Sequence, residues 1–224
     1  MKERGMIFNG EMVRAILDGR KTQTRRIMKV QPKPCNHTNW PDYSPESQWK
    51  SYPNGWCCAV CANGTTIDHR HHAKGITCPF GAVGDRIWVR ETWAEAGAGA
   101  PDLKLYRANY PEHVPTHYEN VPPASDIRWT PSIHMPRRAS RITLEITGVR
   151  VERLASVSDE DAGKEGYPAN PAPYGGTMDK WLWFRGLWDS IYPDQSFKHN
   201  PWVWVIEFKV VPNVPTNSTG SDLR

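Results

Sequence analysis

The segment from Arg20 to Lys33 concentrates positive charge. It holds six basic residues and no acidic one. Such clusters attract phosphate groups, and neighbouring guanidinium groups can hold one phosphate through paired hydrogen bonds. Charge alone is equally compatible with a solvated surface. The predicted phosphate- or ligand-binding residues of this segment are Arg20, Thr22, Arg25 and Arg26.

Lys21 and Thr24 are the residues of this segment that could do covalent chemistry. A threonine hydroxyl attacks an acyl group only when a nearby base takes its proton. A lysine whose pKa is lowered by burial can act as that base. In an extended chain residues 21 and 24 face opposite sides, so they need a turn after Gly19 to meet. Three interpretations of this segment remain: a ligand-binding segment without chemistry, a Lys21–Thr24 catalytic pair, or a solvated loop.

The five cysteines lie between residues 35 and 78. Cys58 and Cys61 form a Cys-x-x-Cys pair, and with Cys35 and Cys78 they could hold a structural Zn²⁺ tetrahedrally. One such pair is weaker evidence than two, and Cys57 and nearby histidines could compete for the metal. The alternative is reduced thiols in a cytosolic protein. We expect no other cofactor to be required.

Residues 86–93 extend the candidate site. A tryptophan beside arginines can stack on a nucleobase, and we include Arg90 and Trp93 among the predicted ligand-binding residues; filling the core is the competing role for Trp93. Glu91 is predicted to point inward, opposite to Arg90, because neighbours on a strand alternate. It could then supply a catalytic carboxylate.

Three helices are predicted to position these residues. Asn9 is a typical N-cap, and apolar residues at helical spacing predict a helix over 10–18 that ends at Gly19. This helix leads directly into the basic segment. Two further helices are predicted to start at the caps Ser158 and Thr177.

Three strands are predicted around them. A turn followed by alternating residues indicates a strand over 86–93, and a second is predicted over 141–154, with a bulge or bend at Gly148. An almost continuous apolar run predicts a buried strand over 202–211. Because strands and helices do not alternate regularly, the fold class is α+β around a curved or barrel-like sheet.

The remaining segments are predicted to be excursions from one domain. Residues 1–211 are assigned to this domain, with a Cys/His-rich insertion over 31–80 and a second loop-rich insertion over 97–137. Residues 212–224 are predicted to be a disordered tail. A structureless loop as long as 31–80 needs something to tie it down, which is the argument for zinc.

Composition excludes a membrane-spanning protein. Hydrophobic residues make up 38% of the chain, the mean hydropathy is −0.65, and no apolar run approaches the ~18 residues of a membrane span. The first residues carry no apolar leader. We therefore expect a cytoplasmic protein that does not contact membranes. Charge is uneven: residues 1–90 carry a net +7 and residues 91–224 a net −3.

Four segments in this order resemble the ASCH family, whose fold is related to the PUA domain of RNA-modifying enzymes. The first contains Gly19, Lys21, Thr22 and Arg26 at the spacing of the family's Gly-x-Lys-Thr-x-x-x-Arg signature. The resemblance covers about half of the chain, and the wider pattern is similar to the larger ASCH proteins of phages and prophages. The four segments are 16–26, 84–90, 142–166, and 191–193 with 204–208.

This resemblance implies a β-barrel with flanking helices and a cleft lined by the Lys-Thr motif. It also implies a nucleic acid, nucleotide or modified nucleoside as ligand. Some small bacterial members hydrolyse the acetyl amide of N4-acetylcytidine, with a lysine and a threonine of the signature acting with a glutamate. The first two correspond to Lys21 and Thr24. The glutamate position, counted back from Tyr192, is Trp183 here, and Glu91 is our candidate for the missing carboxylate.

The leading functional prediction is binding of a nucleic acid, RNA in preference, or of a nucleotide. In this prediction the basic segment Lys21–Arg26 holds the ligand as a loop at the edge of a cleft. One alternative is an amidohydrolase for an acylated pyrimidine nucleoside, with Lys21, Thr24 and Glu91 as catalytic residues. Another is a zinc-stabilised interaction module, in which the insertion 31–80 is the functional surface.

Overall fold

The principal sheet has five strands in the order β1-β5-β8-β9-β2. It is seen in a computed structural model that describes residues 1–31, 49–52, 55–58, 76–170 and 178–213. Strands β1 and β5 are parallel, and the other neighbours are antiparallel. The bounds are β1 Glu3–Ile7, β2 Gln23–Ile27, β5 Arg86–Arg90, β8 Thr143–Arg153 and β9 Trp202–Val211.

Strand β9 is buried on both faces, which explains its almost continuous apolar sequence. Alternate residues of β9 belong to two separate cores. Trp204, Ile206 and Phe208 pack with α1 and the inner faces of β1 and β5, whereas Val203 and Val205 pack beneath α3 and α4. The predicted irregularity at Gly148 is confirmed as a register shift between Ile146 and Gly148 where β8 pairs with β9.

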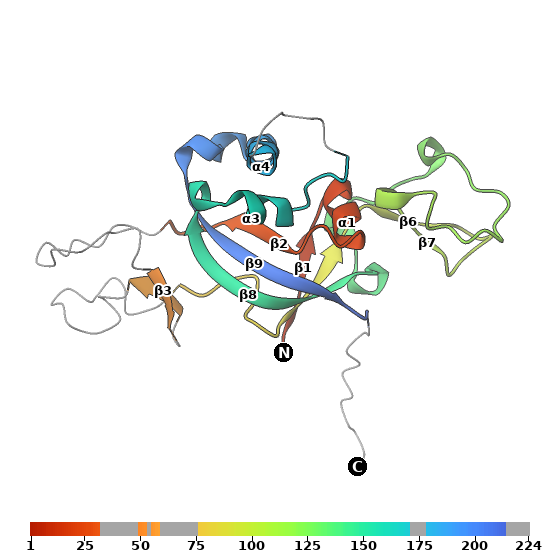
Figure 1. The fold of residues 1–224 in the computed structure, drawn as a ribbon. Helices are drawn as coiled ribbons and strands as arrows, with labels where there is room; N and C mark the ends of the chain where they lie inside the picture. The colour runs from red at the N-terminus through yellow and green to blue at the C-terminus, as the bar shows by residue number, and fades with distance from the viewer. Residues whose placement is uncertain (32–48, 53–54, 59–75, 171–177, 214–224) are drawn as a thin grey trace, which may run out of the picture.

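Three α-helices cover this sheet, with α3 and α4 stacked above it (Figure 1). They are α1 Gly10–Leu17, α3 Asp159–Lys164 and α4 Asp179–Ile191. The predicted caps Asn9 and Ser158 are confirmed, because their side chains accept hydrogen bonds from the backbone N–H groups of Met12 and Asp161. The predicted cap Thr177 lies outside the described residues, and the residue before α4 is Met178.

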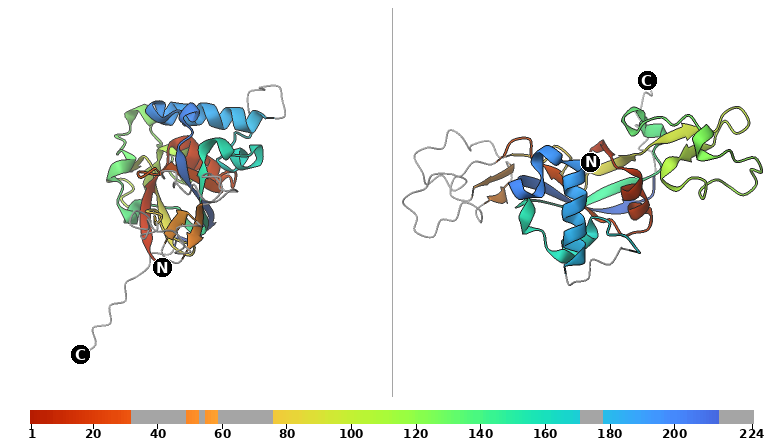
Figure 2. Two further views of the ribbon diagram at one scale, coloured as in Figure 1. Left: turned by 90° about the vertical axis from the view of Figure 1, so that its left-hand side faces the viewer. Right: turned by 90° about the horizontal axis from the view of Figure 1, so that it is seen from above.

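The described strands of the first predicted insertion and the second insertion lie at opposite ends of the sheet (Figure 2, right). The first contains a hairpin, β3 Trp49–Tyr52 and β4 Gly55–Cys58. The second, which we call the arm, comprises Trp93–Ala139 and is built on the antiparallel pair β6 Trp93–Glu95 and β7 Lys104–Tyr106. A small core of Trp93, Tyr106, Met135 and Ala139 holds the arm together.

Short 3₁₀ turns make most of the other connections. In the arm they are η2 Arg107–Asn109, η3 Ala124–Asp126, η4 Ser132–His134 and η5 Arg137–Ala139. Elsewhere they are η6 Leu154–Ser156, η7 Pro193–Gln195 and η8 Phe197–His199.

The structure is mixed α+β, as predicted, but strand pairing does not close the described sheet into a barrel. Its two outer strands are β1 and β2. A side chain bridges them: Nη2 of Arg26 donates to the carbonyl of Ile7 at 3.2 Å. No helix in the described ranges is long and apolar enough to cross a membrane.

Two expectations about the ends of the chain need correction. Strand β1 was not predicted, because it is an edge strand in which only Met6 is buried. The tail predicted from residue 212 begins in an ordered position. The Asn213 side chain accepts from Thr143 Oγ1 at 2.7 Å and donates to the carbonyl of Ser140 at 2.8 Å. Residues 214–224 lie outside the described ranges.

Candidate ligand-binding site

Lys21 is buried at the point where α1 passes into β2. Its ammonium group donates to both the backbone carbonyl and the carboxylate of Glu165, at 2.8 and 2.7 Å. The side chains of Lys21 and Glu165 are 0% and 4% exposed. Burial lowers the pKa of Lys21, and the nearby Glu165 carboxylate offsets only part of that effect. A lysine in this environment can exchange a proton more readily than a surface lysine.

The basic segment is therefore not a solvated loop. Residues Gln23–Ile27 form strand β2, and the Arg25 side chain is fully buried. Its Nη1 donates to Glu165 at 3.1 Å and to the Gln23 side chain at 2.7 Å. Because Lys21 and Arg25 are already paired with carboxylates, neither offers its charge to a phosphate in this structure.

A layer of ion pairs continues from Arg25 towards the surface of the sheet. Nη2 of Arg25 lies 3.5 Å from both Glu152 and Asp161, and Arg150 pairs with the same two carboxylates and with Glu207. Burial would raise the pKa of Asp161, but the hydrogen bond from Lys164 and the charge of Arg150 hold it below its ordinary value. Positive charges from β2 and β8 are thus balanced by carboxylates of α3, β8 and β9.

Thr24 lies on the opposite face of β2 from Lys21. Its hydroxyl accepts from Nη1 of Arg26 at 2.9 Å, and the residue is fully buried. The turn that would bring Lys21 and Thr24 together does not form, because residues 23–27 are extended and paired with β9. A Lys21–Thr24 catalytic pair is therefore not assembled here.

Glu91 is buried, as expected, but it belongs to a different cluster. Both carboxylate oxygens accept from Arg141 at 2.9 Å, and the Arg141 guanidinium lies 4.0 Å from the centre of the Tyr106 ring. Among the described residues, Glu91 makes no hydrogen bond or ion pair with Lys21 or Thr24. Its partner Arg141 follows the arm by two residues, so Glu91 lies at the base of the arm.

The other predicted ligand-binding residues are scattered. Thr22 is exposed beside α3 and donates its backbone N–H to Lys164. Arg90 lies over the Trp88 ring on the outer face of β5 and donates to the carbonyl of Ile133. Trp93 is buried in the core of the arm. Arg20 lines the same cavity as Glu165.

The cavity that adjoins the Lys21–Glu165 pair lies between α1 and α4 and has a volume of about 220 Å³. We call it the α1–α4 cleft. Helix α1 contributes Arg14, helix α4 contributes Trp183, and Arg20 and Glu165 line it between them. The other lining residues are Asn9, Glu11, Met12, Gly166, Pro168, Ala169 and Leu187.

The walls of the cleft are fixed by local contacts. Arg20 donates to the carbonyls of Gly166 and Tyr167 and pairs with Asp18 at 2.7 Å. The rings of Tyr167 and Trp183 meet edge to face, 5.5 Å apart. At position 183, where the sequence resemblance places a glutamate, α4 has a tryptophan, so the carboxylates that line this cleft are Glu11 of α1 and Glu165 and neither comes from α4.

Sequence reasoning missed Glu165 and Arg14. Glu165 precedes Gly166, which ends α3 with φ +106° and packs against Ala15 and Lys21. This packing places Glu165 beside the start of β2, and no local pattern in the sequence shows it. No sequence signal marked Arg14 as a binding residue, because a basic residue is ordinary on the polar face of an amphipathic helix.

The predicted zinc ligands are not tested by this structure. Cys35 and Cys61 lie outside the described residues, and of Cys58 only the strand position in β4 is described. Cys78 is a free, partly buried cysteine whose pKa is raised by burial. No group of three metal-ligating side chains occurs among the residues that the structure describes. The zinc site remains a prediction, which metal analysis of the purified protein would test.

Comparisons with known proteins give one structural match to report. No protein-family model matches the chain, and no curated protein matches it. A crystal structure of an ASCH domain from Lactobacillus crispatus JV V101 is similar with a TM-score of 0.41 and 13% sequence identity. The match covers 94% of this chain and 80% of that one. Membership of the ASCH family therefore stays a prediction from the sequence motifs.

Proposed function

We propose that this chain binds a nucleic acid, RNA in preference, or a free nucleotide, and that one base enters the α1–α4 cleft. The observation that supports this best is the set of groups around one cavity: an indole, two guanidinium groups and two carboxylates. Drug-sized ligands occupy pockets of roughly 300–1,000 Å³. A cavity of about 220 Å³ suits a single base with its sugar better than a dinucleotide.

Each group has a role in this proposal. Trp183 offers a ring on which a base can stack. Arg14 and Arg20 line the cleft and can meet a phosphate. The Arg20 ion pair with Asp18 is solvent-accessible, with side chains 27% and 54% exposed, so a phosphate can compete for it. Glu165 already accepts from Lys21 and Arg25, but an ionised carboxylate has about four acceptor sites. It can therefore accept a further hydrogen bond from the exocyclic amino group of a base such as cytosine.

Titration calorimetry with cytidine monophosphate and fluorescence anisotropy with a labelled single-stranded RNA test the proposal. Trp183→Ala should weaken the binding of both ligands by on the order of tenfold, because base–aromatic stacking contributes about 1–3 kcal/mol. Leu182→Ala is the matched control: Leu182 is the exposed neighbour on the same helix and does not line the cleft. Equal affinities for the two variants would exclude the cleft as the base-binding site.

A second function, hydrolysis of an acylated pyrimidine nucleoside, is favoured by a specific observation. Lys21, with a lowered pKa, lies 2.7 Å from a carboxylate that lines the cleft. A lysine–carboxylate pair can shuttle a proton to the leaving amine while water attacks the acyl carbon. Thr24 is on the other face of β2, so water replaces it as the nucleophile in this version.

Chromatographic assay of N4-acetylcytidine separates these possibilities. If water is the nucleophile, Glu165→Gln should abolish deacetylation and Thr24→Val should retain it. Loss of activity in Thr24→Val, with a normally folded protein, would mean that Thr24 is the nucleophile after all. No turnover by the wild-type protein would leave binding as the function of the cleft.

A further inference from the structure

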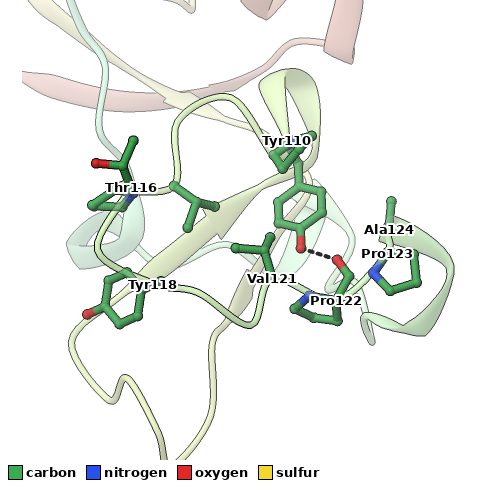
Figure 3. A pocket seen from close by; sticks show the side chains of 10 residues that line it. Tyr110, Thr116, Tyr118, Val121, Pro122, Pro123 and Ala124 are labelled. Atoms are coloured by element: carbon green, nitrogen blue, oxygen red, sulfur yellow. Dashed lines mark hydrogen bonds between the residues drawn. The ribbon is translucent and has the colours of Figure 1, made fainter.

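We infer that the arm carries a second base-binding subsite for the same nucleic-acid strand, a statement that rests on the function proposed above. The arm contains a cavity of about 370 Å³. It opens between Tyr110 and Val121 on one side and Thr116 and Tyr118 on the other (Figure 3). Val114, Ala124 and four prolines complete the lining.

The walls of this cavity are held in place before any ligand arrives. The Tyr110 hydroxyl donates to the carbonyl of Pro122, as the dashed line in Figure 3 shows. The Trp129 ring meets Tyr110 edge to face at 5.6 Å, and its Nε1 donates to the carbonyl of Ala124 at 2.9 Å. A rigid wall loses little conformational freedom when a ligand binds.

The chemistry of the lining suits a flat ring. It consists of aromatic, proline and aliphatic side chains, with Thr116 as the only aliphatic hydroxyl. Tyr118 is half-buried, and the His117 ring packs beside it with centroids 4.3 Å apart. Tyrosine and histidine rings stack on unpaired bases without demanding a particular base.

The arm cavity and the α1–α4 cleft are linked through η2. Arg14, which lines the cleft, donates to the carbonyl of Ala108 at 2.6 Å. Tyr110, which lines the arm cavity, follows Ala108 by two residues, and a residue spans at most about 3.6 Å. Arg107 directly precedes Ala108 and is exposed. In this proposal one strand places a base in each cavity and a phosphate beside Arg107.

The test compares an RNA hexamer with cytidine monophosphate by anisotropy and calorimetry. Tyr118→Ala should weaken hexamer binding by on the order of tenfold and leave mononucleotide binding unchanged. Ile133→Ala, an exposed arm residue that does not line the cavity, should change neither. Val121→Glu is a second variant; it alters a partly exposed lining residue and should weaken hexamer binding in the same way.

Other results would overturn the inference. Hexamer binding as tight in both Tyr118→Ala and Val121→Glu as in wild type would exclude the subsite. The subsite would also be excluded if the hexamer bound no more tightly than cytidine monophosphate while Trp183→Ala still weakened the binding of both ligands. This result would leave the proposed function intact. Binding of neither ligand by the wild type would remove the proposed function as well. Capture of a proline-rich peptide, with no effect of Tyr118→Ala on RNA, would assign the cavity to protein recognition.

Discussion

At the scale of single residues, Lys21 gives a prediction about pH. Its pKa in the folded protein is lowered by burial. At pH values between this lowered pKa and the ordinary value of about 10.4, the unfolded chain therefore binds more protons than the folded protein does. Stability rises with pH wherever the unfolded state binds more protons. The unfolding free energy of wild type minus that of Lys21→Met should therefore increase as pH rises through this interval, as urea titrations can measure. A constant difference would mean that the pKa of Lys21 is not lowered.

Glu91 gives a prediction about stability instead of catalysis. Its carboxylate is 2% exposed and is held by two hydrogen bonds from Arg141. Glu91→Gln should destabilise the fold by about 3 kcal/mol, because it leaves the partly buried Arg141 guanidinium, 19% exposed, without its counter-charge. Glu145→Gln is the control, since Glu145 pairs with the exposed Lys209 and should matter little. Loss of deacetylation without loss of stability in Glu91→Gln would restore a catalytic role.

The site could be predicted only in part from its residues. The motif identified Arg20 and Lys21, and strand alternation correctly placed Lys21 and Thr24 on opposite faces. Glu165 could not be found in the same way, because it is 144 residues from Lys21. Their contact depends on how α3 ends against β2, which no local pattern encodes.

At the scale of elements, the end of α3 is the connection that places Glu165. Gly166 has φ +106°, and a Cβ there would lie 2.9 Å from the Cβ of Ala15. Gly166→Ala should lower the unfolding free energy by more than the ~1–2 kcal/mol of a left-handed alanine and should weaken ligand binding. Gly186→Ala, in an open position within α4, should stabilise by about 0.5–1 kcal/mol. Thermal unfolding of both variants measures these changes in stability. A Gly166→Ala variant as stable as the wild type would show that α3 can end in another way.

Elements with strong local signals could be predicted, and edge elements could not. Asn9, Ser158 and the buried run 202–211 mark their elements because caps and apolar runs act locally. Asp161 lies three residues after the cap Ser158, where the acid of a capping box would stand, but its carboxylate accepts from Arg150 at 2.7 Å. A buried ion pair competes successfully with a local cap.

At the scale of the whole molecule, folding pairs basic residues of the first half of the chain with acidic residues of the second half. The basic segment of the first half lies against carboxylates of the second: Lys21 on Glu165, and Arg25 on Glu165, Glu152 and Asp161. Lys21 and Arg25, which the sequence suggests as phosphate ligands, are therefore part of an internal layer of ion pairs. In the proposed binding mode the cations that meet the nucleic acid are Arg14 and Arg20 of the cleft and Arg107 of the arm.

This arrangement predicts a shallow salt dependence of RNA binding. For single strands the slope of log K against log salt is about −0.7 per neutralised phosphate. Contacts from Arg14, Arg20 and Arg107 should give a slope of about −2, whereas contacts from all six basic residues of 20–33 would give about −4. Arg107→Ala should reduce the slope by about 0.7, while Lys29→Ala should leave it unchanged. Anisotropy titrations at several salt concentrations measure this slope. A value near −4 would mean that the strand binds the basic segment and that the ion pairs around Arg25 open when it does.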